Sequence, residues 1–338
     1  MTVRSRAAHR LNSELHHGLA AAFIGERSAV TLARSRSPEP AERKIAERIR
    51  PVGLHSSGSR RRTRNLQFGT GSGMNNNRVM TPSPRIALVT GVGRRRSIGA
   101  GLALGLARDG WNLALGYWSF YDDRLGYEGT PEDPEAVAEQ CRALGSDVVL
   151  LPGDLADVHL PQRLVTSTVE ELGPLTALVM SHCESVNSSI LNTSVESWDR
   201  HFAVNARATW LLIKAFTEQL PVDPGPSSDV RGRIVALTSD HTAHNTPYGA
   251  SKGALDRIIV AAAVELADRG VRANAINPGP IDTGWMTDEI RAMGASGTPA
   301  GRLGTPEDTA DLVRFLLSDQ GAWINGQVLY SNGGFRTS

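Results

Sequence analysis

The chain has 338 residues, of which 40% are hydrophobic and 21% are charged, and its formal net charge is +1. Two cysteines, Cys141 and Cys183, are too few for a disulfide framework in a chain of this length. No run approaches the ~18 apolar residues that a membrane-spanning helix needs. We therefore expect a soluble cytoplasmic protein.

Residues 1–84 differ in composition from the rest of the chain. Of the 36 basic and 35 acidic residues, this segment holds 15 and five, and residues 85–338 hold the other 21 and 30. The segment contains clusters such as SRRRTR (59–64) and few large apolar side chains. Because such a segment cannot bury enough surface to offset its ordering entropy, we predict a disordered, Arg-rich tail over 1–84.

Three interpretations of this tail compete. A basic arm that contacts nucleic acid is disfavoured, because no aromatic residues are interleaved and no nucleic-acid module is recognisable. A transit segment is disfavoured by the five acidic residues. We favour the third interpretation, in which translation begins at Met74 or Met80, and we expect no nucleic-acid partner.

From Arg85 onward, short apolar runs alternate with longer segments of helical period, which is typical of βαβ units. The expected strands are 85–91, 111–118, 147–154, 177–182, 232–239, 271–279 and 327–334. The expected helices are 97–110, 134–145, 197–220, 248–270 and 305–319. The pattern predicts one α/β domain over 85–338, a doubly wound parallel sheet of the Rossmann type with its ligand crevice at the carboxyl ends of the strands.

A glycine-rich segment, TGVGRRRSIGAG (90–101), follows the first expected strand and opens the first expected helix. Glycine lets the backbone approach a phosphate, and the helix N-terminus offers unpaired N–H groups and a favourable dipole. The position favours a pyrophosphate site, with an ordinary glycine-rich turn as the alternative.

Tyr248 and Lys252 lie four residues apart on an expected helix, so their side chains share a face. An adjacent ammonium, together with a further positive charge in a dry site, would lower the phenol pKa from ~10 to ~7, which is about 4 kcal/mol. Lys252 is one of only three lysines in a chain that otherwise uses arginine. That choice favours a specific role over an exposed tyrosine and a solvated lysine.

Ser239 ends an expected strand nine residues before Tyr248, so it lies at the same crevice, where its hydroxyl can fix a substrate carbonyl oxygen. Asn205 lies in an apolar helix, where an amide does not help stability unless it has a partner. The alternative for Asn205 is a residue that satisfies a bend in the helix.

Several features, in this chain order, resemble the short-chain dehydrogenase/reductase family across 85–338: the glycine-rich turn, Asn205, Ser239, Tyr248, Lys252 and NPGPIDTG (277–284). The resemblance implies an NAD(P)-dependent oxidoreductase that transfers hydride between the cofactor and a carbonyl/alcohol pair. It implies that Tyr248 is the acid/base and that Lys252 holds the ribose hydroxyls and lowers the phenol pKa. It further implies that Ser239 orients the carbonyl and that Asn205 anchors a water.

The same resemblance implies the residues that bind the cofactor. They are Gly91, Arg95, Arg96, Ser97, Ile98, Gly99, Asp154, Leu155, Ser181, Tyr248, Lys252, Pro278, Gly279, Ile281 and Thr283. The sequence departs from the family in three places. Five residues separate Gly91 from Ser97, which replaces a glycine; Met180-Ser181-His182-Cys183 replaces Asn-Asn-Ala-Gly; and the loop before Tyr248 is short and carries two histidines.

Those two histidines, His241 and His244, either line the substrate pocket or face solvent. Metal binding by them together with His182 has no supporting ligand spacing, so we predict no metal site.

The end of the second expected strand bears on the choice of cofactor. It reads Gly-Tyr-Trp-Ser (116–119), with no acid before Asp122 to pair with ribose hydroxyls. Arg94, Arg95 and Arg96 in the turn offer a positive surface suited to a 2′-phosphate. We therefore predict NADP(H), with NAD(H) as the alternative.

The leading hypothesis is a 3-oxoacyl-carrier-protein-reductase-like enzyme acting on a small-molecule or acyl-thioester substrate. The enoyl-reductase branch of the family is disfavoured, since it places six rather than three residues between its Tyr and Lys. The alternative is a non-catalytic NAD(P)-sensing scaffold. The C-terminal segment resembles the one that builds tetramers in the family, so we expect a homotetramer or homodimer. GWMTDEIRAMGASG (284–297) is the expected lid, with Trp285 in the pocket wall or the core.

Overall fold

The computed structural model describes residues 85–335, except residue 128 and residues 221–229. The predicted disordered tail, residues 1–84, lies outside this described part of the chain. Within the part described, no helix is both long and apolar enough to cross a membrane.

The described residues form one seven-stranded sheet with the order β3-β2-β1-β4-β5-β6-β7, in which each neighbouring pair is parallel. The strands are β1 (Ile86–Thr90), β2 (Asn112–Tyr117), β3 (Val148–Pro152), β4 (Ala177–Met180), β5 (Gly232–Leu237), β6 (Val271–Asn277) and β7 (Val328–Tyr330). The predicted doubly wound sheet is confirmed, and its order reverses between β1 and β4.

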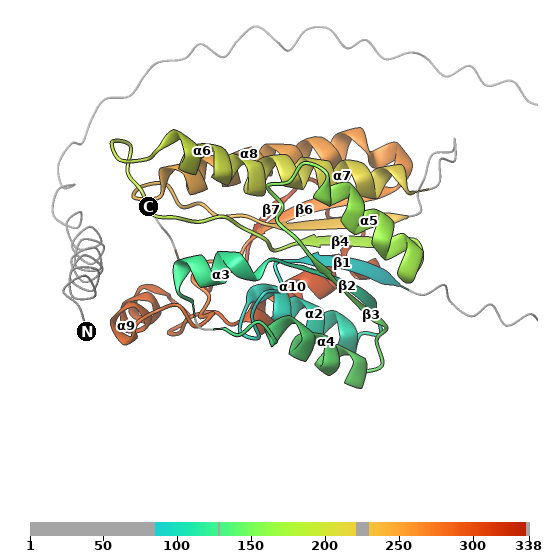
Figure 1. Cartoon of the computed structure of the whole chain (residues 1–338), viewed down its shortest axis with the longest axis horizontal. Helices are drawn as coiled ribbons and strands as arrows, with labels where there is room; N and C mark the ends of the chain where they lie inside the picture. The colour runs from blue at the N-terminus through green and yellow to red at the C-terminus, as the bar shows by residue number, and fades with distance from the viewer. Residues whose placement is uncertain (1–84, 128, 221–229, 336–338) are drawn as a thin grey trace, which may run out of the picture. The chain divides into compact units, whose positions relative to one another are not determined.

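Helices cover both faces of the sheet (Figure 1). The helices are α2 (Ile98–Arg108), α3 (Ser119–Leu125), α4 (Asp133–Ala143), α5 (Leu160–Glu171), α6 (Val195–His201), α7 (Ala208–Glu218), α8 (Thr246–Glu265), α9 (Asp288–Gly297) and α10 (Pro306–Leu316). One buried apolar cluster joins α5, α7 and α8 to the sheet, and a second joins α2, α4 and α10 to its other face. Because both faces are covered, the strands read as continuous apolar runs.

The helix expected over 197–220 is wrong as a single regular helix. The chain runs through α6, then a π-helical turn over Phe202–Arg207, then α7. The π-helical turn contains Asn205, and its cause is a set of long-range hydrogen bonds that are described with the site below.

Three helices were absent from the sequence prediction. In α5 the buried residues Leu160, Leu164, Val165 and Thr168 follow a helical period, but the segment LVTSTV is rich in residues that disfavour helices. The short α3 has no buried residue, so no periodic pattern marks it. The third, α9, lies within the segment expected to form a lid.

Candidate active site

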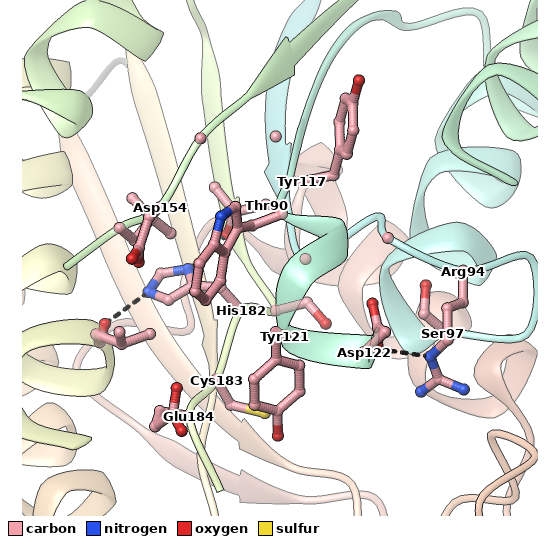
Figure 2. A pocket seen from close by; sticks show the side chains of 18 of the residues that line it. Thr90, Arg94, Ser97, Tyr117, Tyr121, Asp122, Asp154, His182, Cys183 and Glu184 are labelled. Atoms are coloured by element: carbon pink, nitrogen blue, oxygen red, sulfur yellow. Dashed lines mark hydrogen bonds and ion pairs between the residues drawn. The ribbon is translucent and has the colours of Figure 1, made fainter. Parts of the chain in front are cut away.

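A cavity of about 180 Å³ lies at the carboxyl ends of the central strands. Its walls come from the segments that follow β1, β2, β3 and β4, together with α3 and the loop after β6 (Figure 2). Seven of the residues expected to bind the cofactor line this cavity: Gly91, Ser97, Ile98, Asp154, Leu155, Ser181 and Thr283. The crevice therefore lies where a doubly wound sheet is expected to place it.

The turn after β1 fits a phosphate group. Gly91 has φ +81°, and a Cβ there would lie 2.7 Å from the carbonyl carbon and oxygen of Ser181. A Cβ on Gly99 would lie 2.3 Å from the oxygen of Gly91. Ser97 caps α2, with its hydroxyl accepting a hydrogen bond from the Ala100 N–H at 3.0 Å. Only glycine allows these approaches, and they bring the turn to the N-terminus of α2, the end of a helix that favours a negative charge.

The three arginines of the turn have separate carboxylate partners. Arg94 Nε lies 2.8 Å from Asp122, Arg95 Nε lies 3.0 Å from Asp133, and Arg96 Nη2 lies 3.4 Å from Asp282. Arg94 is 8% exposed and lines the cavity, whereas the side chains of Arg95 and Arg96 are half exposed and do not line it. The sequence prediction did not foresee these partners, because each is distant in the chain.

Tyr248 and Lys252 lie on α8, with the phenol hydrogen-bonded to the side chain of Ser239. The Lys252 ammonium donates to the Leu237 carbonyl at 2.8 Å and lies 5.8 Å from the centre of the Tyr248 ring. Lys252 is 2% exposed. The phenol, hydroxyl and ammonium expected from the sequence are therefore gathered at the ends of β5 and α8.

Burial raises the pKa of Tyr248, the negative charge of a Cys183 thiolate would raise it further, and the hydrogen bond from Ser239 lowers it. Burial is the largest of these effects, so the pKa of the Tyr248 phenol lies above its ordinary value. Burial also lowers the pKa of Lys252 itself. The phenol therefore needs a further nearby positive charge before it can ionise near neutral pH.

Asn205, in the π-helical turn, bonds through its side chain to the loop after β4 and to α8. Its Nδ2 donates to the Glu184 carbonyl at 2.8 Å and to Ser251 Oγ at 2.9 Å, and its Oδ1 accepts from the Glu184 N–H at 2.7 Å. Asn205 is fully buried. These bonds tie the loop after β4 to α8, so the amide has partners, as expected of an asparagine in an apolar helix.

The loop after β6 holds four of the residues expected at the nicotinamide end. Gly279 has φ +67° and lies against Asn332, and Ile281 is buried and bridges to Gly304. Thr283 accepts a hydrogen bond from Arg94 at its carbonyl, at 2.9 Å. This loop is thereby joined to the phosphate turn, and Pro278 is its first residue after β6.

His182 is buried at the centre of the site. Its Nε2 lies 3.1 Å from the Val204 carbonyl, to which it donates, and its Nδ1 lies 2.7 Å from Thr90 Oγ1. Burial, followed by the charge of Lys252, lowers the pKa of His182 to about 3. The imidazole is therefore neutral at physiological pH.

The two loop histidines differ in position. The His241 ring centre lies 6.3 Å from that of Tyr248, edge to face, and burial lowers its pKa. His244 is exposed, with φ +62°. The position of His241 beside Tyr248 therefore fits a residue of the substrate pocket, whereas His244 faces solvent. Across residues 85–335, apart from the gaps given above, no three His, Cys, Asp or Glu side chains gather as metal ligands would.

Sequence reasoning missed a polar network at the edge of the cavity. Glu184, 1% exposed, pairs with Arg124 and with Arg200. Arg200 also pairs with both oxygens of Asp154, at 2.7 and 3.0 Å, and its guanidinium lies 4.6 Å from the ring centre of Trp118. The available signal was an acid four residues after the buried strand β4, but its partners come from α3 and α6.

Comparison with known proteins identifies the family. Residues 91–336 match the family model described as Enoyl-(Acyl carrier protein) reductase. The chain is 32% identical to an uncharacterized oxidoreductase, YjdA, of Bacillus subtilis, over 74% of this chain and 96% of that protein. It is 31% identical to the 3-oxoacyl-[acyl-carrier-protein] reductase FabG of Staphylococcus aureus, over 73% and 96%.

The chain belongs to the short-chain dehydrogenase/reductase family. The crystal structure of a dehydrogenase/reductase from Sinorhizobium meliloti 1021 matches with a TM-score of 0.63 and 29% identity, covering 74% of this chain and 94% of that one. The protein is therefore an NAD(P)-dependent oxidoreductase acting on CH–OH/C=O groups, as the sequence predicted.

We predict that His182→Gln weakens the pH dependence of stability below neutrality. The folded imidazole has a pKa of about 3 and the unfolded one about 6.5, so the unfolded chain binds its proton first. Stability is then lost as the pH falls from about 6.5 towards 3, at ~1.4 kcal/mol per unit. Between pH 7.5 and 5, urea unfolding should show roughly 2 kcal/mol more loss for the wild type than for the variant.

The matched control for this experiment is His159→Gln, which changes an exposed imidazole. It should keep the wild-type dependence on pH. Equal pH slopes for the wild type and His182→Gln would contradict a buried neutral His182.

Proposed function

We propose that this protein is a carbonyl reductase that uses NADP(H), with chemistry like that of 3-oxoacyl-carrier-protein reductases. The observation that carries the proposal is the pairing of the Tyr248 phenol with Ser239, with the buried Lys252 ammonium on the same helix face. A non-catalytic nucleotide-binding scaffold has no use for a buried ammonium and a buried phenol that both resist their charged forms.

Each residue has a role that follows from its position. Ser239 donates to the substrate carbonyl oxygen and holds it against the phenol. Tyr248 transfers its proton to that oxygen as charge develops on it. Lys252 binds the ribose hydroxyls and adds positive charge near the phenolate that remains. Asn205 holds the loop after β4 in place and anchors a water on the path that returns the proton.

A reduced nicotinamide supplies the hydride in this chemistry. The residues proposed to hold the cofactor are those in and beside the crevice: Gly91, Arg95, Arg96, Ser97, Ile98, Gly99, Asp154, Leu155, Ser181, Tyr248, Lys252, Pro278, Gly279, Ile281 and Thr283. The close approaches at Gly91 and Gly99 support this set, because a Cβ at either position would close the turn. A positively charged nicotinamide, when bound, would add to the charge of Lys252 in lowering the phenol pKa.

We propose carbonyl rather than enoyl reduction although the matching family model bears the enoyl-reductase name. The spacing of Tyr248 and Lys252, one helical turn apart, supports the carbonyl assignment. The likeness to FabG supports an acyl thioester as the substrate class, and a panel of ketones and acyl thioesters assayed with NADPH tests it.

We predict that Tyr248→Phe lowers turnover by roughly 10²- to 10⁴-fold, because the proton donor is removed while the ring is kept. The dissociation constant for NADPH should change less than about threefold, since the phenol is not the main cofactor ligand. Steady-state kinetics and a fluorescence titration measure the two effects. Tyr330→Phe, an exposed phenol, is the control. Unchanged turnover in Tyr248→Phe would remove this residue from the mechanism.

The preference for NADP(H) rests on the arginines of the turn. Arg95 is held by Asp133 through both its backbone N–H and its Nε, whereas Arg96 has one 3.4 Å contact with Asp282. An exposed ion pair of that length contributes little, so the Arg96 guanidinium is free to bind a 2′-phosphate. No acid follows β2 until Asp122, which is paired with Arg94.

We predict that Arg96→Ala raises the dissociation constant for NADPH about tenfold, because one charge-assisted contact is lost. The constant for NADH should stay near the wild-type value, since NADH lacks the 2′-phosphate. Arg108→Ala, at an exposed arginine in the last turn of α2, is the control and should affect neither. An equal loss for both cofactors, or tighter wild-type binding of NADH than NADPH, contradicts the assignment.

We also propose that the protein assembles as a homotetramer or homodimer. Two outer surfaces expose large apolar side chains. One lies on α7 and α8, with Trp210 52% and Val264 74% exposed, and the other lies near β7, with Trp323 97% and Tyr330 59% exposed. Exposed apolar surface of this kind is typical of protein interfaces.

We predict that the double variant Trp210→Glu, Val264→Glu has a smaller sedimentation coefficient than the wild type. Two carboxylates placed in an apolar contact would have to be desolvated on association. Val158→Glu, at an exposed apolar residue on another surface, should sediment as the wild type does. A wild-type protein that sediments as a monomer would contradict the proposed assembly.

A further inference from the structure

The short helix α3 reaches across the crevice, from the phosphate turn to the loop after β4. On one side Asp122 bonds to Arg94 of the turn. On the other side Arg124 pairs with Glu184, and the Tyr121 hydroxyl lies 3.5 Å from the Ser185 carbonyl. Figure 2 shows Tyr121 beside Cys183 and Asp122 directed to Arg94. The ends of β1 and β4, between which a dinucleotide must bind, are thereby bridged by one helix.

Asp122 forms an ion pair with Arg94, the buried cation of the phosphate turn. Its Oδ1 lies 2.8 Å from Arg94 Nε, and its Oδ2 lies 2.7 Å from where a Cβ on Gly93 would be. The carboxylate thus rests against the glycine backbone of the turn. Burial raises the pKa of Asp122, and the Arg94 charge opposes that rise. Since Arg94 is almost fully buried, Asp122 supplies the negative charge it needs.

Tyr121 lines the cavity, whereas the proposed acid/base Tyr248 does not. The phenol hydrogen-bonds to the Cys183 thiol, and both side chains line the cavity. Cys183 is close enough to Tyr248 and Lys252 to shift the pKa of each, yet neither of these two residues lines the cavity. A ring that entered from the phosphate turn would therefore meet Tyr121 before it met Tyr248.

The small size of the cavity agrees with a crevice that is partly filled by α3. About 180 Å³ is below the ≈ 300–1,000 Å³ that is usual for drug-sized ligands, and a nicotinamide dinucleotide is larger than most of these. The cavity nevertheless extends from Asp154 at the end of β3 to Thr283 after β6. The crevice has the span that a dinucleotide needs but not the free volume, and α3 fills part of the difference.

We propose that α3 is a lid that closes the dinucleotide crevice of the free protein, with Asp122 standing in for a cofactor phosphate on Arg94 and Tyr121 blocking the path to Tyr248. The inference rests on the proposed function only in taking a nicotinamide dinucleotide as the ligand. When α3 moves away, the ion pair between Asp122 and Arg94 breaks, and a phosphate of the dinucleotide takes the place of the carboxylate.

The lid has a consequence for binding. If only a fraction of the molecules is open, the apparent dissociation constant is the intrinsic constant divided by that fraction. A change that weakens the closed state alone must then tighten binding. The rate of binding must also reach a plateau at high dinucleotide concentration, because opening is a first-order step that precedes it.

Two variants weaken the closed state from opposite sides of the crevice. Asp122→Asn removes the charge that holds Arg94, while the amide still accepts a hydrogen bond. Arg124→Gln removes the pair with Glu184, which keeps Arg200 as its partner. Asp123→Asn removes one negative charge from an exposed position of the same helix and is the control. Thermal unfolding of all four proteins checks that each is folded.

The experiment measures NADPH binding by fluorescence at equilibrium and by stopped-flow mixing. We expect Asp122→Asn to lower the dissociation constant about tenfold and to raise the plateau rate by a similar factor. Arg124→Gln should change both quantities in the same direction. Asp123→Asn should match the wild type. Amide hydrogen exchange over residues 119–127 should be faster in the first two variants than in the wild type.

The outcomes separate this inference from the proposed function. Binding by all four proteins with the same constants and rates overturns the lid and leaves the cofactor assignment intact. Weaker binding by Asp122→Asn and Arg124→Gln also overturns it, because α3 would then be part of the bound site. Absence of dinucleotide binding in every variant and in the wild type overturns both the cofactor assignment and the lid.

Discussion

Gly91 packs against the backbone of Ser181 at the point where β1 and β4 end side by side. This contact is the constraint on which the site depends, because it sets how closely the phosphate turn and the loop after β4 can approach. The connection after β1 leads towards β2 and β3, and the connection after β4 leads the other way, towards β5 and β6. The carboxyl ends of β1 and β4 are therefore not covered by their own connections. The crevice is a result of strand order, and the side chains around it only decide what it binds.

The electrostatics of the site follow from burial more than from pairing. The Lys252 ammonium, the Tyr248 phenol and the His182 imidazole all lie close together in a volume with little water, and burial is the largest cause of each pKa shift. Each shift favours the neutral form. A charged ligand that enters the site would therefore act on the pKa values of all three groups together.

Much of the fold and the core of the site can be predicted from the sequence, since they depend on local patterns. Short apolar runs that alternate with helical segments predict the parallel sheet. Within that sheet, the positions of Ser239, Tyr248 and Lys252 in the sequence place the three residues together. What could not be predicted depends on contacts between distant segments. The carboxylate partners of Arg94, Arg95 and Arg96 lie 28 to 186 residues away, and α3 has no apolar period of its own. Likewise, the π-helical turn exists because Asn205 bonds to Glu184 and Ser251, which no local pattern encodes.

The π-helical turn makes the helical stretch from α6 to α7 sensitive to the loss or gain of a residue. A π-helical turn contains one residue more than the α-helical path it replaces, and it is less stable than a regular turn. Removal of a single residue between Phe202 and Arg207 would let α6 run smoothly into α7, while rotating the Asn205 amide away from the loop it holds. In this protein an indel inside a buried helix would therefore alter the catalytic crevice more than a longer one in a surface connection.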